Sequence, residues 1–181
     1  MQKYSEVIGL PVICADSGKK AGVVKDILFY PRQREIGAII IEKKSTEIKR
    51  RAVLPEDILD IGKGAVIIRE SLSIRCLKRQ EYTERFGKCG NIQGLRIYTR
   101  SGEELGTVKD VLFDYRTGIV EGVEVSDGLF QDIYQGRRML PLFGKVEFAE
   151  DNILVDREAI EEMVSNGGGI KARILGNNNE K

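Results

Sequence analysis

The sequence predicts a mainly β protein built from two small β-barrels in tandem. The first observation is a repeat, because GKKAGVVKDILF at residues 18–29 returns as GEELGTVKDVLF at residues 102–113 with seven identical positions. The second is that both copies consist of short runs rich in Val, Ile, Leu and Phe, separated by turn signals that contain Gly, Asp or Pro. Further matching stretches keep their order at a period of about 84–86 residues, which indicates duplication of one folding unit.

The length of 181 residues is enough for two domains of under about 100 residues each. We predict a first barrel over residues 1–70, a linker over 71–89, a second barrel with a short C-terminal helix over 90–165, and a flexible tail over 166–181. The linker lacks β-turn signals and is expected to contain one or two helical turns. Asp156 is the expected N-cap of the C-terminal helix.

Four glycines occupy corresponding places in the two copies. Gly18 and Gly102 lie in the loops DSGKK and RSGEE, where a hairpin needs a residue at positive φ. Gly22 and Gly106 open the next strand, where a missing Cβ permits a bulge or a close crossing of strands. We therefore expect all four glycines to have structural roles.

Two strands differ in their hydrophobic pattern. In GVVKDILF the apolar residues fall on both faces, which favours a bulged and tightly coiled strand in a small barrel. In EGVEVSD the alternation is regular, so Val123 and Val125 are predicted to point inward and Glu124 outward.

The composition excludes several kinds of catalytic site. The chain has no His, which excludes Ser-His-Asp and Cys-His catalysis and metals held by imidazole. Cys14, Cys76 and Cys89 show no CxxC spacing and are predicted to be reduced thiols of a cytoplasmic protein. No apolar run approaches the roughly 20 residues of a membrane-spanning helix. We expect no enzyme activity, no cofactor and no metal, and the net charge of +1 gives no global basic field.

The repeated Lys-Asp pair, Lys25-Asp26 and Lys109-Asp110, is the first candidate for chemistry. Adjacent residues of a strand point to opposite faces, so the two charges of each pair are poorly placed to act together. We interpret both aspartates as acceptors of backbone N–H groups at a bulge, with the lysines on the surface. The glycines of GKKAG and GEELG lack the order of a phosphate-binding loop. An acidic group without calcium-loop spacing is expected to be a solvated surface, namely Glu103, Glu104, Asp127 and Asp132.

Two surfaces are candidates for binding a macromolecule. The first is basic and combines the stretch KKSTEIKRR (43–51) with the linker (69–88), and its candidate contact residues are Lys49, Arg50 and Arg51. Such a surface suits RNA phosphates, anionic lipid or an acidic protein face, although a solvated loop and linker is the alternative. The second surface lies in DGLFQDIYQG, the corresponding loop of the second copy, and consists of Leu129, Phe130, Ile133 and Tyr134.

These motifs, in this order, resemble the PRC-barrel family over both copies, about 150 residues. The pattern is a G-x-x-h-x-x-x-x-G-x-x-h-G-x-V-x-D-h-h-h-D stretch, in which h is apolar, followed by a G-h-x-h strand and a Leu-Pro strand. The first copy departs from it at Tyr30-Pro31, where an acidic residue is common, and by an extra residue before its first hairpin. The second copy fits through Gly94, Gly102, Gly106, Val108, Asp110, Val111, Leu112, Phe113, Asp114, Gly122, Leu140 and Pro141.

The resemblance implies two PRC-type barrels, each of about six strands, joined by the partly helical linker. The module is similar to the cytoplasmic domain of the photosynthetic reaction-centre H subunit and to the C-terminal domain of a ribosome-maturation factor. It also occurs in small bacterial and archaeal proteins, some of them sporulation-associated. This implies a scaffold or adaptor that binds a protein partner and takes no small-molecule substrate. RNA or ribosome association, peripheral association with the inner membrane face and homodimer formation stay open as alternatives.

Overall fold

The computed structural model describes two compact units. The first unit consists of Met1–Asn91 together with Leu112–Val120, and the second of Ile92–Val111 together with Glu121–Lys181. The described residues are 1–30, 33–43, 50–86, 92–126, 139–142, 146–149 and 151–156. The predicted C-terminal helix after Asp156 and the predicted tail lie outside them.

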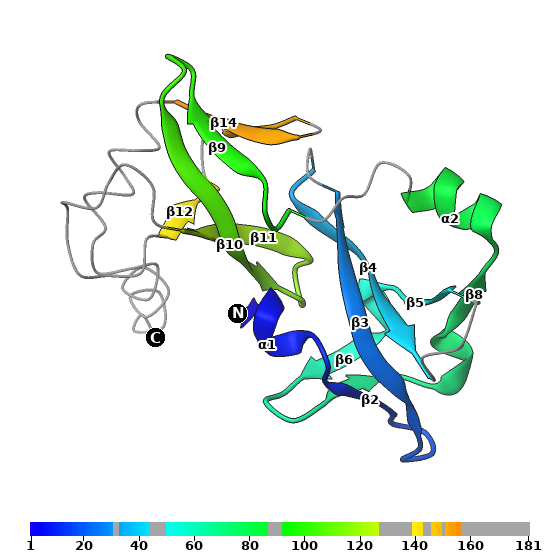
Figure 1. The fold of residues 1–181 in the computed structure, drawn as a ribbon. Coiled ribbons are helices and arrows are strands. Elements are labelled where there is room, and N and C mark those ends of the chain that lie inside the picture. Colours follow the sequence, from blue (N-terminus) through cyan, green and yellow to red (C-terminus); the bar gives the residue numbers. More distant parts are fainter. Residues whose placement is uncertain are drawn as a thin grey trace. The chain divides into compact units, whose positions relative to one another are not determined.

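Short strands dominate the first copy of the repeat (Figure 1). Its helices are α1 (Tyr4–Val7), η1 (Pro55–Asp57), η2 (Ser71–Ser73) and α2 (Arg79–Phe86), where η denotes a 3-10 helix. Its strands are β1 (Gln2–Lys3), β2 (Pro11–Cys14), β3 (Lys20–Tyr30), β4 (Glu35–Glu42), β5 (Arg50–Val53), β6 (Ile58–Ile61), β7 (Val66–Ile68) and β8 (Arg75–Leu77). The second copy contains β9 (Arg96–Thr99), β10 (Glu104–Asp114), β11 (Ile119–Val125), β12 (Met139–Pro141), β13 (Val146–Phe148) and β14 (Asn152–Val155).

The strands pair in the same way in both copies. β2 pairs antiparallel with β3, β3 with β4 and β4 with β5, while β7 runs parallel to β2 and antiparallel to β6. In the second copy β9 pairs antiparallel with β10 and β11 with β12, while β14 runs parallel to β9 and antiparallel to β13. This shared pairing confirms the predicted mainly β fold and its duplication.

The hairpin glycines adopt the predicted conformation. Gly18 has φ 65° and Gly102 has φ 89°, a region that is strained for residues with a Cβ. The N–H of Gly18 donates to the Cys14 carbonyl over 2.8 Å, and the N–H of Gly102 donates to the Thr99 carbonyl over 3.0 Å. Both hairpin loops are therefore closed by a backbone hydrogen bond at the glycine.

A bulge repeats at the start of β3 and of β10. Shifts of register leave Ala21 without an opposite residue on β2, and Leu105 without one on β9. The next residue is in each case the glycine predicted for a bulge, Gly22 or Gly106. A Cβ on Gly22 would lie 2.5 Å from the carbonyl oxygen of Glu42. β4 therefore passes too close to β3 for any side chain at this position.

A second bulge explains why β3 is apolar on both faces. The register between β3 and β4 shifts at Lys25, which has no opposite residue. Val24 pairs with Ile41 and Ile27 with Ile39. Ile41 and Ile39 lie two residues apart on β4, so Val24 and Ile27 share a face although three positions separate them. All four of these apolar side chains are buried.

The other face of the same sheet carries a second apolar cluster, which we call the outer cluster. Tyr82 comes from α2 and Leu77 from β8, so the segment predicted to be a linker packs on the first barrel. The buried members of the outer cluster are Leu28, Ala38, Ala52 and Leu54, and the partly buried residues packed against them are Tyr30, Ile40, Leu77 and Tyr82.

The predicted linker contains a strand that sequence patterning missed. α2 supplies the predicted helical turns, but Arg75–Leu77 pairs antiparallel with Arg50–Ala52 to form β8. Three residues are too few to display the alternation that identifies a strand, and the partner strand is remote in the sequence. The prediction of one or two helical turns is therefore met by α2, and the strand Arg75–Leu77 comes in addition to it.

The expected exposure of Glu124 to solvent is wrong, although Glu124 lies on the face of β11 opposite that of Val123 and Val125. Val123 and Val125 are buried as expected, but Glu124 is only 8% exposed. β11 pairs with β12 at these residues, and Glu124 lies opposite Met139. Because three consecutive side chains are buried, both faces of β11 are covered here. The alternation of apolar and acidic residues in the sequence therefore does not identify a face exposed to solvent.

Gly22→Ala should destabilise the fold. The new methyl group meets the backbone of β4, and overpacking of this kind costs about 1–3 kcal/mol in the free energy of unfolding. Urea denaturation monitored by circular dichroism measures the difference. Gly64→Ala is the matched control, since nothing lies within 4 Å of a Cβ there. Equal stabilities of the two variants would contradict the close approach of β3 and β4.

Candidate interaction site

Residues Leu112–Val120, which we call the hairpin end, form the turn between β10 and β11 and belong to the first unit. β1 pairs antiparallel with one side of the hairpin end, with Gln2 opposite Phe113 and Lys3 opposite Leu112. β4 pairs with the other side, with Glu35 opposite Ile119. The first barrel thus holds, by strand pairing on both sides, a hairpin that comes from the second copy of the repeat.

The pairing with β4 joins residues that occupy equivalent positions in the two copies. The Ile36 N–H donates to the Gly118 carbonyl over 2.7 Å, and the Val120 N–H donates to the Arg34 carbonyl over 2.8 Å. Ile36 corresponds to Val120 and Arg34 to Gly118, each 84 positions apart. Exchanging the copies therefore exchanges the two hydrogen bonds, as in an isologous contact.

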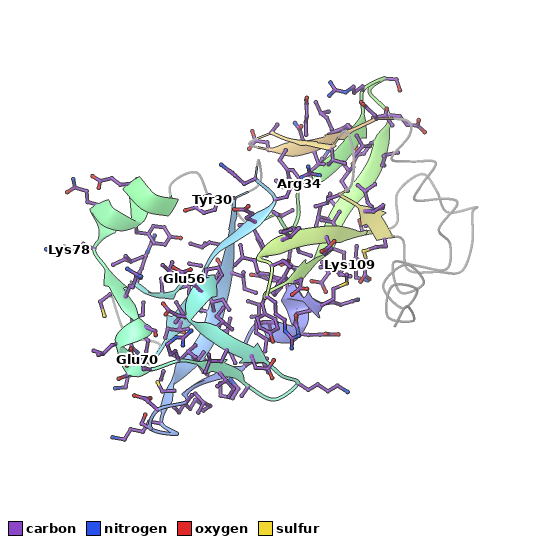
Figure 2. The ribbon with its side chains drawn as sticks, turned by 180° about the vertical axis from the view of Figure 1, so that it is seen from behind. Tyr30, Arg34, Glu56, Glu70, Lys78 and Lys109 are labelled. Carbon is purple, nitrogen blue, oxygen red and sulfur yellow. The ribbon has the colours of Figure 1, made fainter. Side chains whose placement is uncertain are left out.

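The turn conformation is also shared by the two equivalent positions. Arg34 has φ 57° and Gly118 has φ 74°. Arg34 is the one residue other than glycine with positive φ among those the structure describes. Tyr30 and Arg34 lie on either side of the β3–β4 turn (Figure 2).

Aromatic packing accompanies the strand pairing. The rings of Phe29 and Phe113, again equivalent residues, lie 6.1 Å apart at an interplanar angle of 61°. Both side chains are 0% exposed. Tyr4 of α1 is the next ring, 6.3 Å from Phe29. Edge-to-face packing of this kind adds about 0.5–1.5 kcal/mol to the burial of the rings.

Hydrogen bonds connect the hairpin end and β1 to β6. The Tyr115 hydroxyl donates to Asp60 Oδ1 over 2.6 Å, and Arg116 Nε donates to the Tyr115 hydroxyl oxygen over 3.1 Å. Gln2 Nε2 donates to the Ile61 carbonyl oxygen over 3.2 Å. Asp60 and Ile61 both belong to β6. These bonds therefore link β6 to the hairpin end and to β1, which pair with each other.

The pKa of the Asp60 carboxyl lies below its ordinary value. The largest cause is the hydrogen bond from the Tyr115 hydroxyl, burial acts in the opposite direction, and the Ile61 N–H and the Arg116 charge lower the pKa further. The Ile61 N–H donates to Asp60 Oδ1 over 2.9 Å. Asp60 is therefore a carboxylate at neutral pH and accepts both bonds in that form.

The Lys-Asp pairs occupy the structural positions that we predicted for them. Asp26 Oδ1 accepts the Ile27 N–H and the Tyr4 hydroxyl, each over 2.8 Å. Asp110 is 5% exposed, and its Oδ1 accepts the Val111 N–H over 2.9 Å. The aspartates are thus engaged by the chain itself.

Both lysines of these pairs lie on the surface. Lys25 Nζ is 3.7 Å from Glu42 Oε2, and Lys109 is exposed on β10 (Figure 2). Exposed ion pairs contribute little to stability, so the pair of Lys25 and Glu42 adds little to the fold.

Of the three candidate contact residues of the predicted basic surface, Arg50 and Arg51 are described, and both have partners within the first unit. The Arg50 guanidinium lies 3.9 Å from the centroid of the Tyr82 ring, a cation–π contact. Arg51 Nη1 donates to the Ala21 carbonyl over 3.0 Å, at the bulge of β3. Lys49 and the remainder of 44–49 lie outside the described residues.

The second predicted surface, Leu129, Phe130, Ile133 and Tyr134, also lies outside the described residues. Among the described residues, no group of three or more Cys, Asp and Glu side chains is placed to hold a metal ion. None of the described helices is long and apolar enough to cross a membrane. Cys14 and Cys76 are free, and burial raises the pKa of the Cys14 thiol.

Sequence reasoning missed the residues that hold the hairpin end. Tyr115 and Asp60 belong to no repeated motif, and Arg34 replaces the glycine of the other copy. The repeated Phe29 and Phe113 did carry a signal, but a repeat indicates equivalent positions and does not indicate that they touch.

Tyr115→Phe should destabilise the protein in a pH-dependent way. The folded pKa of Asp60 is lowered, so the stability from this bond is complete above the ordinary aspartate pKa of about 4 and is lost as the pH falls through the folded pKa. The difference in unfolding free energy between the variant and the natural protein should therefore shrink on acidification. In an Asp60→Asn background, Tyr115→Phe should lower the unfolding free energy by an amount that does not depend on pH. If Asp60 is retained and the effect of Tyr115→Phe is still the same at every pH, the assignment of the bond to the Asp60 carboxylate is contradicted.

Comparison with known proteins agrees with the duplicated topology. The PRC-barrel domain family matches this chain twice, over residues 1–73 and 86–160. The chain is also 25% identical over 153 residues to the uncharacterized protein YrrD of Bacillus subtilis (strain 168), an alignment that covers 83% of this chain and 85% of that protein. The two family matches follow the two copies of the strand pattern and include most of the sequence. The chain therefore belongs to the PRC-barrel domain family and carries the domain twice.

Proposed function

We propose that this chain is a non-enzymatic scaffold or adaptor that binds a protein partner. The observation that carries the proposal is the hairpin end, which the first barrel holds by strand pairing with β1 and β4. Backbone pairing combined with a buried aromatic ring is a mode by which proteins recognise extended polypeptide. A module that holds a hairpin from the other copy in this way has the chemistry needed to hold a partner's strand.

The use of the polar groups supports a binding role over a catalytic one. Asp26, Asp110 and Asp60 each accept hydrogen bonds from the chain itself. The sequence has no His to act as a general base. We propose that the protein acts through its surface, without a cofactor.

Arg50 and Tyr82 support a protein partner over RNA. RNA-binding surfaces combine free cationic side chains with exposed aromatic rings on which bases stack. Here the Arg50 guanidinium lies over the Tyr82 ring, and Tyr82 packs on the outer cluster. The free thiols of Cys14 and Cys76 support a place in the cytoplasm.

Affinity capture with the full chain tests the proposed function. The lysate of the source organism is treated with nuclease and cleared of membranes, and recovered proteins are identified by mass spectrometry. The proposal predicts a protein that binds the purified chain directly, with an affinity of about micromolar or tighter by calorimetry. Parallel titrations use single-stranded RNA and anionic vesicles. Binding to RNA alone with a steep salt dependence, or to anionic vesicles alone, would contradict the proposal.

A further inference from the structure

We propose that β8 is a docking edge for an extended acidic segment of the partner, which adds to the sheet beside β8. The inference rests on the proposed function and names its site. β8 lies in residues 74–85, which fall between the two family matches. This segment therefore lies outside both copies of the family domain. A binding site specific to this protein can be formed there without changing the domain itself.

β8 is paired on one side by β5, with Arg50 opposite Leu77 and Ala52 opposite Arg75. In the part of the chain that the structure describes, no strand pairs with its other side. The N–H and C=O groups along that side are those with which an added strand forms hydrogen bonds. Packing of Leu77 on the outer cluster anchors β8 to the barrel.

The charged side chains of residues 69–78, the stretch that contains β8, are mainly basic. Arg69, Arg75 and Lys78 are exposed, and Glu70 is the one acidic residue within 69–78. Lys78 projects from the junction of β8 and α2, and Glu70 lies at η2 (Figure 2). The net charge of this stretch favours an occupant that carries Asp or Glu.

Leu72 of η2, three residues before the start of β8, is an exposed apolar side chain. Its side chain is 84% exposed, more than that of any other large apolar residue among those described. Such exposure leaves apolar area in water that a partner's side chain can cover. A strand that alternates acidic and apolar residues meets both requirements, because one face reaches the cations and the other covers apolar surface.

Charge also disfavours the β8 strand of a second copy as the occupant. Pairing β8 with the β8 of another copy would bring the Arg75 and Lys78 cations of both copies onto one short edge. Charged residues on an edge strand are a common means of preventing such self-association. The cations of β8 therefore repel the β8 strand of a second copy and attract an acidic strand.

A fluorescently labelled peptide of about ten residues that alternates Glu and Val is the probe, with fluorescence anisotropy as the readout. The full chain should bind it, and Arg75→Glu and Leu72→Glu should each weaken binding about tenfold or more. A Lys-Val peptide should not bind. Lys63→Glu and Leu59→Glu are matched controls at exposed positions away from β8 and should change the affinity less than about twofold.

Two results would overturn the inference. One is that the full chain does not bind the acidic peptide, and the other is that Arg75→Glu and Leu72→Glu bind the peptide as tightly as the two control variants do. Preferential binding of single-stranded RNA, lost in Arg75→Glu, would assign the edge to nucleic acid instead. The same variants are used with the partner recovered by affinity capture. Unchanged partner binding in Arg75→Glu and Leu72→Glu would leave the proposed function standing and reject this site, whereas absence of any protein partner would reject the function itself.

Discussion

Backbone pairing at the hairpin end is the interaction on which the first unit depends. Buried N–H and C=O groups need partners, and here the N–H groups of Ile36 and Val120 donate to the carbonyls of Gly118 and Arg34. The same pairing brings the ring of Phe113 against Phe29 and seals both from solvent. Without it, large apolar rings and unpaired strand edges would face water, which explains why the first unit is discontinuous in sequence.

The sequence was sufficient to predict the strands, the duplication and the places of the glycines. Gly18 and Gly22 could be placed because the loop conformation and the close approach of β4 each require the absence of a Cβ. The contacts of the hairpin end could not be predicted in this way. Positive φ at Arg34 has no residue signature, and the bond from Tyr115 to Asp60 joins two unrepeated residues that are remote in the sequence.

The outer cluster explains where the two copies diverge. Sequence patterning attributed the apolar character of β3 to a bulge, which is half of the reason. The other half is that β8 and α2 cover the outside of the sheet, so Leu28 is buried on the face opposite Ile27. Tyr30 packs on the outer cluster, whereas the equivalent Asp114 accepts the Arg116 N–H over 2.8 Å in its turn. The departure of the first copy from the family pattern is therefore a packing requirement.

Amide hydrogen exchange at Ile36 and Val120 measures the docking of the hairpin end most directly. If the hairpin end is an integral part of the first unit, both amides exchange only when the whole unit unfolds, at the rate of core amides such as Ile39. Their protection is then independent of protein concentration, because the contact forms within one chain. Fast exchange at Val120 while Ile39 stays protected, or protection that rises with concentration, would contradict this picture of the first unit.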